Sequence, residues 1–131
     1  MREIKFRAWD YEMKNMYKLV KFISHKDGIN ALDRWFSWEY VMQFTGLKDK
    51  NGKEIYEGDL LQEYPNYPIW KVFYEIDGFC IRSGDTQHRL ASVFGFPDRL
   101  NIIGNIYENP DLCPSGDLIA VKKQTATEDN D

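Results

Sequence analysis

The sequence predicts a mainly β fold, and three observations carry this prediction. Aromatic residues make up 15% of the 131-residue chain, and their side chains suit a pleated, half-buried surface. Short apolar runs of strand length alternate with glycine, asparagine and aspartate turn signals. Such closely spaced strands favour a small antiparallel barrel or meander of SH3-like type, here with an N-terminal β-hairpin and one or two short helices. A chain of this length is expected to form one domain.

The N-terminal hairpin is predicted from the alternation of side chains. Residues 3–9 place Ile4, Phe6 and Ala8 on one face and charged residues on the other. This pattern is typical of a half-buried antiparallel strand. A polar connection leads to a second apolar run over residues 16–23, which we predict to be the partner strand.

The next segment, residues 29–38, has no simple strand pattern. Ile29, Leu32 and Phe36 fit one face of a helix. Trp35 and Trp38 interrupt any strand alternation. We therefore predict a short helix or an irregular segment. The two tryptophans allow two interpretations: contacts in the core or between subunits, or a platform on which nucleic-acid bases stack.

The central stretch, residues 43–61, combines a hairpin signal with a strand entry. Asn51 and Gly52 are the favoured pair for the two positive-φ positions of a type I′ turn. Gly58 lies in a second predicted turn, which leads into a strand. These glycines are expected to serve backbone geometry first, so Gly52→Val or Gly58→Val should impair folding before any binding.

Two further strands are predicted over residues 69–76 and 79–82, joined by a turn at Asp77-Gly78. Residues 86–96 are expected to form a short helix or a loop.

The final strand covers residues 100–107, where Gly104 marks a bulge or a close backbone approach. Beyond it, the polar residues 114–131 are predicted to form a disordered tail. A single β domain is therefore expected over residues 1–113.

The formal net charge of −4 is unevenly distributed along the chain. Residues 1–26 contain seven basic and three acidic side chains, a net +4, so the remainder carries −8. Lys5, Arg7, Lys18 and Lys21 are expected to form a basic face on the hairpin. Such a face suits an acidic surface of another subunit, a nucleic acid or plain solvent.

Cys80 and Cys113 are too few for a disulfide scaffold and too isolated for a metal or redox pair. No apolar run approaches the roughly 20 residues that span a bilayer, and the N-terminus lacks a signal-peptide pattern. We therefore expect a cytoplasmic protein without membrane contact.

The sequence contains no recognisable catalytic constellation, so we predict a non-enzymatic protein without metal or cofactor. The run from Asp49 to Gly52 lacks the ligand at position 47 that a calcium loop needs. Glu54, Glu57 and Asp59 permit an acidic catalytic pocket near Tyr56. Acceptance of hydrogen bonds from turn amides is the favoured role for Glu57 and Asp59.

Three blocks, residues 1–10, 43–59 and 103–110, together resemble the YopX family of phage and prophage proteins. The resemblance implies a small β-rich fold, a phage or prophage origin in a bacterial host, and a homo-oligomer, and it supplies no catalytic residues. Its signature positions, mostly of turn and strand-end types, are Trp9, Gly46, Asp49, Asn51, Gly52, Tyr56, Gly58, Asp59, Gly104, Asn105, Tyr107 and Asn109.

Three functions follow as hypotheses. The first is a non-enzymatic oligomeric interaction module, whose partner is itself or a phage or host protein. The alternative is a single-stranded nucleic-acid-binding protein of phage replication or transcription, suggested by the basic hairpin and the barrel-like pattern. The second alternative is an enzyme with the acidic pocket near Tyr56.

Overall fold

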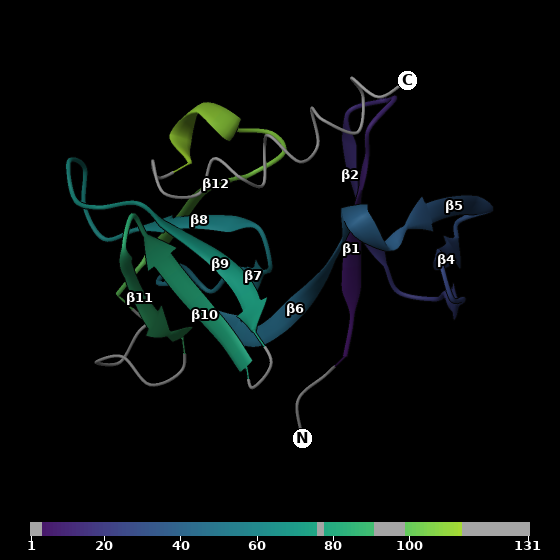
Figure 1. The fold of residues 1–131 in the computed structure, drawn as a ribbon, viewed down its shortest axis with the longest axis horizontal. Coiled ribbons are helices and arrows are strands. Elements are labelled where there is room, and N and C mark those ends of the chain that lie inside the picture. The colour runs from purple at the N-terminus through teal and green to yellow at the C-terminus, as the bar shows by residue number, and fades with distance from the viewer. Residues whose placement is uncertain (1–3, 76–77, 91–98, 114–131) are drawn as a thin grey trace.

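The computed structural model describes residues 4–75, 78–90 and 99–113. These residues form antiparallel β-strands in four-, five- and three-stranded sheets, with short 3-10 helices (Figure 1). The predicted mainly β class is therefore confirmed, and the predicted tail over 114–131 lies outside the described residues. No helix in these ranges is long and apolar enough to cross a membrane.

The four-stranded sheet has the order β2-β1-β6-β7. β1 (Phe6–Asp10) and β2 (Asn15–Leu19) form the predicted N-terminal hairpin. β1 also pairs with the beginning of β6 (Val41–Lys48), whose later part pairs with β7 (Glu54–Tyr56). β1 is therefore an inner strand, and β6 connects it to the C-terminal half of the fold.

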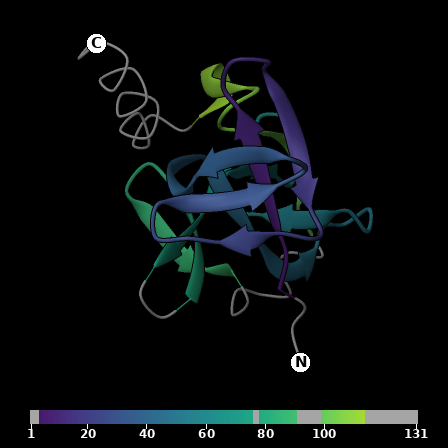
Figure 2. The same ribbon diagram turned by 90° about the vertical axis from the view of Figure 1, so that its right-hand side faces the viewer.

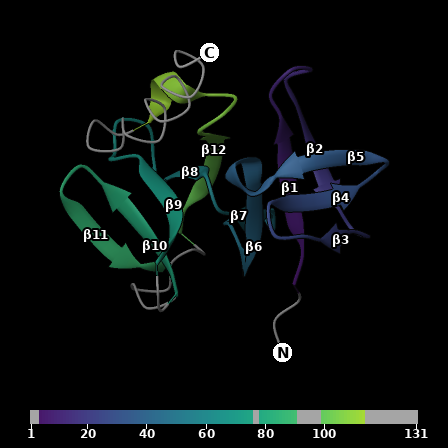
Figure 3. The ribbon, with the colours of Figure 1, turned by 45° about the vertical axis from the view of Figure 1, so that its right-hand side comes forward.

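The three-stranded sheet consists of β3 (Ile23–Ser24), β4 (Gly28–Ala31) and β5 (Arg34–Ser37). Figures 2 and 3 show it lying across β1 and β2, on the side away from the five-stranded sheet. A 3-10 helix, η1 (Trp38–Tyr40), follows β5.

The prediction of a helix or irregular segment over 29–38 is wrong, because most of that range forms the β4–β5 hairpin. Leu32 and Asp33 have φ values of 55° and 57°, and Ala31 lies opposite Arg34. Two positive-φ residues in a two-residue loop define a type I′ turn. Leucine is unusual at such a position, which explains why the sequence carried no hairpin signal.

The five-stranded sheet contains the predicted meander. β8 (Asp59–Gln62), β9 (Trp70–Glu75), β10 (Gly78–Ser83) and β11 (Thr86–Arg89) pair in chain order, and β12 (Asn101–Asn105) returns to pair with β8. The sheet curls into a half-barrel, and its SH3-like character stays a prediction.

Two predictions around this sheet change in detail. Thr86–Arg89 is a strand where a short helix or loop was predicted over 86–96, and residues 91–98 lie outside the described ranges. Gly78 begins β10 opposite Glu75, while Asp77 of the predicted turn is not among the described residues. A last 3-10 helix, η3, covers Pro110–Leu112.

The Asn51-Gly52 turn is not of type I′, because positive φ occurs at Gly52 (82°) but not at Asn51. The amide of Gly52 donates to the carbonyl of Asp49 (3.0 Å), and the amide of Asp49 donates to the carbonyl of Lys53 (2.8 Å). This is a three-residue loop with a bulge at the glycine. The Asp49 carboxylate stabilises it by accepting from the amides of Asn51 and Lys53, each at 2.9 Å.

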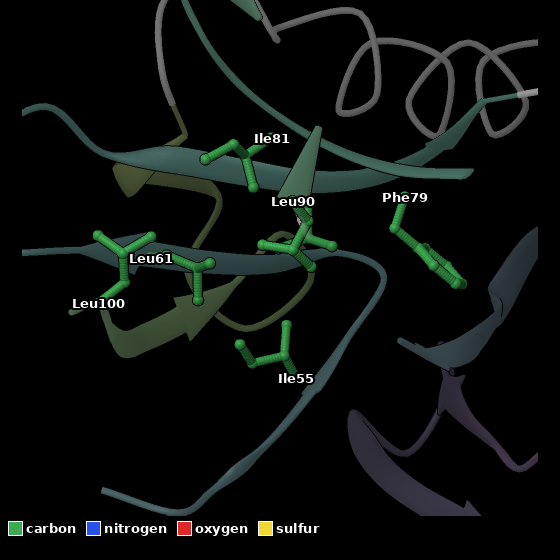
Figure 4. Close-up of a cluster of buried hydrophobic side chains, with 7 residues drawn as sticks. Ile55, Leu61, Phe79, Ile81, Leu90 and Leu100 are labelled. Atoms are coloured by element: carbon green, nitrogen blue, oxygen red, sulfur yellow. The ribbon is translucent and has the colours of Figure 1, made fainter. Parts of the chain in front are cut away.

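Two clusters of buried apolar side chains support the fold. The first fills the curled sheet and comprises Ile55, Leu61, Val72, Phe79, Ile81, Leu90 and Leu100 (Figure 4). The second lies between the β1–β2 hairpin and the three-stranded sheet and comprises Ala8, Leu19, Ile29, Ala31 and Phe36. Cys80 is buried as predicted, and Cys113 is partly exposed.

Candidate functional site

A buried ion pair joins the two halves of the fold. Nη2 of Arg7 on β1 donates to Oδ1 of Asp59 on β8 (2.7 Å) and to the carbonyl of Glu57 (3.2 Å). The guanidinium also lies 4.9 Å from the ring centroid of Tyr56, whose amide donates to Oδ2 of Asp59 (2.8 Å). Burial raises the pKa of Asp59, while Arg7 and the Tyr56 amide oppose that shift.

Asp49 joins the central turn to the last strand. It is buried, and its Oδ2 accepts from the amide of Ile102 on β12 (3.0 Å). Nδ2 of Asn51 donates to Oδ1 of Asn101 (2.9 Å) beside it. Because amides already occupy both oxygens of Asp49, this carboxylate serves the turn.

The third signature block closes the end of β12. The Asn105 side chain accepts from the amides of Tyr107 (3.0 Å) and Glu108 (2.9 Å), and Asn109 Oδ1 accepts from the Asn105 amide (3.1 Å). Asn109 Cγ lies 2.6 Å from the place where a β-carbon on Gly104 would sit. The predicted close approach at Gly104 is confirmed, and so is the bulge, since the pairing register shifts between residues 102 and 104.

Aromatic stacking completes this junction. The rings of Trp9 and Tyr107 are nearly parallel, with centroids 5.8 Å apart, and the Tyr107 hydroxyl donates to the carbonyl of Glu39 (3.0 Å). Burial raises the pKa of Tyr107 to about 12. Gly46 and Gly58 have positive φ (88° and 85°), the former within β6 where its pairing with β7 shifts register and the latter in the turn before β8. We refer to the contacts among these signature residues as the junction.

The predicted basic face is divided. Arg7 is buried in its ion pair, and Lys5 pairs with Glu54. Lys18 and Lys21 are exposed, although Nζ of Lys18 lies 3.9 Å from Glu54. The four residues therefore do not form one open surface, because the C-terminal half of the fold covers half of them.

The three carboxylates proposed for an acidic pocket are engaged separately. Glu54 pairs with Lys5 and Asp59 with Arg7, while Oε1 of Glu57 accepts from the amide of Gln43 (2.8 Å). Glu57 and Asp59 thus accept from backbone amides, although the amide at Glu57 belongs to strand β6 and not to the predicted turn. Glu57 alone of the three lines a cavity of about 150 Å³, and burial raises its pKa.

Within the described ranges, no group of three or more His, Cys, Asp or Glu side chains is arranged to hold a metal ion.

An exposed apolar row crosses the three-stranded sheet. Ile23, Asn30 and Trp35 are successive cross-strand partners and are exposed, Ile23 to 66% and Trp35 to 52%. The His25 ring lies 5.5 Å from the Trp35 ring, and Trp38 Nε1 donates to the His25 carbonyl (2.9 Å). We call these five residues the outer face. Sequence reasoning singled out its two tryptophans but missed the sheet that aligns them with Ile23.

A groove of about 410 Å³ lies at one edge of the same sheet. Its lining is contributed by β5, by the end of β1 and the turn after it, and by Tyr40. Sequence reasoning missed this groove, because it depends on the unpredicted β4–β5 hairpin.

Comparisons with known proteins agree with this architecture. The model of the family described as YopX protein matches residues 5–113. The crystal structure of protein EF1440 from Enterococcus faecalis is similar, with 28% sequence identity and a TM-score of 0.57 over 86% of this chain and 99% of that one. No curated protein matches the sequence. Since the family model spans most of the chain, including residues 5–10 of the first signature block and all of the other two, the protein belongs to the YopX family.

Proposed function

We propose that this protein is a non-enzymatic interaction module that assembles with copies of itself through the outer face. The observation that carries this proposal is the exposed row of Ile23 and Trp35 on a regular sheet. Tryptophan is enriched at the energetic centres of protein interfaces. A sheet face that exposes Ile23 and Trp35 on either side of Asn30 is suited to a second protein surface.

The charge distribution supports a second copy as the partner. The N-terminal 26 residues carry a net +4 and the remainder −8, and the exposed Lys21 and Lys26 flank β3. Opposite charges on different parts of one chain favour head-to-tail contacts, which close into rings when the rotation permits. In this proposal the protein is a phage or prophage accessory factor in the bacterial cytoplasm, where a phage or host protein is a further partner.

Light scattering after size exclusion tests the proposal. The wild type is expected to form an oligomer at physiological salt that dissociates on dilution and with rising ionic strength. Trp35→Ser combined with Ile23→Ser should shift it to the monomer. Tyr67→Ser is the matched control, because Tyr67 is also 52% exposed but lies outside the outer face. A wild type that is strictly monomeric would remove the proposal.

A second candidate, single-stranded nucleic-acid binding, is favoured by one specific observation. The paired rings of His25 and Trp35 lie on a sheet surface flanked by Lys21 and Lys26. Aromatic side chains on a sheet commonly stack on unpaired bases. Fluorescence anisotropy with a labelled mixed-sequence oligonucleotide at low salt decides this candidate. Trp35→Ala should weaken binding about fivefold or more, and absence of binding by the wild type eliminates it.

A further inference from the structure

The groove beside β5 is lined by two segments of the chain. Residues 34–37 of β5 form one wall, and residues 9–12, at the end of β1 and in the turn after it, form the other. Tyr40 completes the lining. The pairing between β1 and β6 reaches only to Ala8, opposite Val41, so β1 continues past its partner exactly where the groove begins.

Among the described residues β5 is an edge strand, because it pairs with β4 alone in the order β3-β4-β5. Ala31 and Arg34 close the two-residue turn, and the Trp38 amide donates to the Asp27 carbonyl (3.4 Å) across the same ladder. In an antiparallel ladder alternate residues direct their backbone groups to the partner strand. Trp35 therefore presents its N–H and C=O groups, and Ser37 its N–H group, to the other edge, along the groove, while the Ser37 carbonyl begins the 3-10 helix η1.

The side chains of the groove favour a cation. The rings of Tyr11 and Tyr40 lie with centroids 5.9 Å apart, and the Lys14 ammonium already lies 5.3 Å from the Tyr11 centroid. Aromatic faces attract ammonium and guanidinium groups. The contact with Lys14 thus shows that the Tyr11 ring accepts a cationic group.

The charges around the groove point the same way. Asp10 is neutralised by Arg34 (Oδ2 to Nη1, 2.6 Å), and its Oδ1 accepts from the amides of Glu12 and Met13. Glu12 is exposed and makes no ion pair with any residue of the described ranges. With Asp10 and Arg34 cancelled, Glu12 is the one uncompensated charge among the residues that line the groove.

We propose that this groove binds an extended peptide segment carrying a lysine or arginine, which adds to β5 as a further strand. Strand addition draws affinity from main-chain hydrogen bonds and specificity from alternate side chains. The peptide backbone pairs with Trp35 and Ser37, and its cationic side chain lies against Tyr11 and Tyr40 near Glu12. The site uses the backbone of Trp35 at the edge of the sheet, whereas the assembly proposed above uses the Trp35 side chain on the outer face, so the peptide is an additional partner.

A labelled seven-residue peptide of alternating valine and threonine with a central lysine is a suitable probe for the full chain. Ser37→Pro removes the edge N–H, and the φ of Ser37 (−65°) already matches that of proline. Ser37→Ala is the matched control, because it removes the hydroxyl that accepts from the Glu39 amide but keeps the N–H. We expect Ser37→Pro to weaken binding at least about fivefold and Ser37→Ala to leave it within about twofold.

The charge requirement has its own test. The same peptide with a central glutamate should bind several-fold more weakly to the wild type. Glu12→Lys should bind the glutamate peptide more tightly than the lysine peptide, while Glu12→Gln should show a smaller preference for the lysine peptide. Equal binding of the two peptides would overturn the charge assignment, and equal binding by the two Ser37 variants would overturn strand addition. Absence of binding by a wild type that still oligomerises would remove the groove proposal and leave the outer face intact.

Discussion

Folding removes the two charges of the Arg7–Asp59 pair from water, so the stability of the protein depends on both partners being present. Arg7 is 9% and Asp59 1% exposed. Asp59→Asn keeps the acceptor for the Tyr56 amide but leaves the Arg7 charge buried without a counter-ion. Such a loss typically costs about 3–5 kcal/mol of unfolding free energy, measurable by urea denaturation.

The double variant Arg7→Met/Asp59→Asn removes both charges and should recover part of that loss. Glu63→Gln is the control, because Glu63 pairs with Arg99, whose side chain is 55% exposed. A surface pair contributes at most about 1 kcal/mol. If the double variant is no more stable than Asp59→Asn, the cost does not arise from the unpaired guanidinium.

Glu57 supplies a pH dependence whose sign follows from its burial. Desolvation raises its pKa in the folded state above the ordinary 4.5, although the Gln43 amide and Arg7 oppose the shift. Glu57→Gln keeps an oxygen acceptor for that amide and removes the buried charge. The variant should therefore be more stable than the wild type near neutral pH.

The folded wild type binds a proton at Glu57 at a higher pH than the unfolded chain does, so its stability rises as the pH falls toward 4.5. The gap between Glu57→Gln and the wild type should shrink over that range and close below it. Thermal unfolding across pH measures this gap. Glu75→Gln, at an exposed position, is the control, and a gap independent of pH would contradict the assignment.

At the scale of elements, substitutions at Gly52 and Gly58 separate the free-energy cost of backbone strain from the cost of overpacking. Both glycines have positive φ, 82° and 85°. A β-carbon on Gly52 would have no atom within 4 Å, whereas one on Gly58 would lie 3.2 Å from Met42 Sδ and 3.4 Å from Ile106 Cγ1. Gly52→Ala should therefore cost about 1–2 kcal/mol for its backbone conformation.

Gly58→Ala should cost about 1–3 kcal/mol more, because the new methyl group is overpacked. Paired urea titrations provide the comparison. If the two variants lose equal stability, Met42 and Ile106 yield without cost and the packing contribution is absent.

The elements also show what the sequence could predict. Alternation identified the N-terminal hairpin, and the strand signals located β9, β10 and β12 within a few residues. The β4–β5 hairpin escaped because Leu32 and Asp33 adopt positive φ without glycine or asparagine. At Asn51-Gly52 the dipeptide preference was overridden by the Asp49 carboxylate, which holds a different loop.

The candidate sites were harder to predict for a related reason. Alternation correctly placed the side chains of Arg7 and Ala8 on opposite faces of the strand. The burial of Arg7, however, depends on Asp59, which lies more than fifty residues later in the sequence. The signature residues were recognised as turn and strand-end types, whereas their meeting at one junction is a tertiary property. The groove depends on the register of two sheets, which no local pattern contains.

At the scale of the whole molecule, the junction links two separate apolar clusters. One cluster fills the five-stranded sheet, and the other lies between the β1–β2 hairpin and the three-stranded sheet. Between them run strand β6, the Arg7–Asp59 pair and the Trp9–Tyr107 stack. Of the signature residues, Trp9, Tyr56, Asp59 and Tyr107 take part in these links.

Weakening the junction should therefore separate the unfolding of the two clusters. Tyr107→Ala removes the stack on Trp9 and the hydrogen bond to Glu39, a loss of about 2–4 kcal/mol. Tyr107→Phe removes only the hydrogen bond, about 0.5–1.5 kcal/mol. Native-state hydrogen exchange compares the amides of Leu19 and Ile29 with those of Val72 and Ile81.

In the wild type, we expect both amide sets to open with one free energy, as in a single cooperative unit. In Tyr107→Ala the two sets should open with different free energies, and Tyr107→Phe should give a smaller difference. Tyr74→Ala is the control, since Tyr74 is 51% exposed and lies outside the junction. If both sets fall by the same amount in Tyr107→Ala, the remaining links, above all the continuous backbone of β6, are sufficient to couple the two halves.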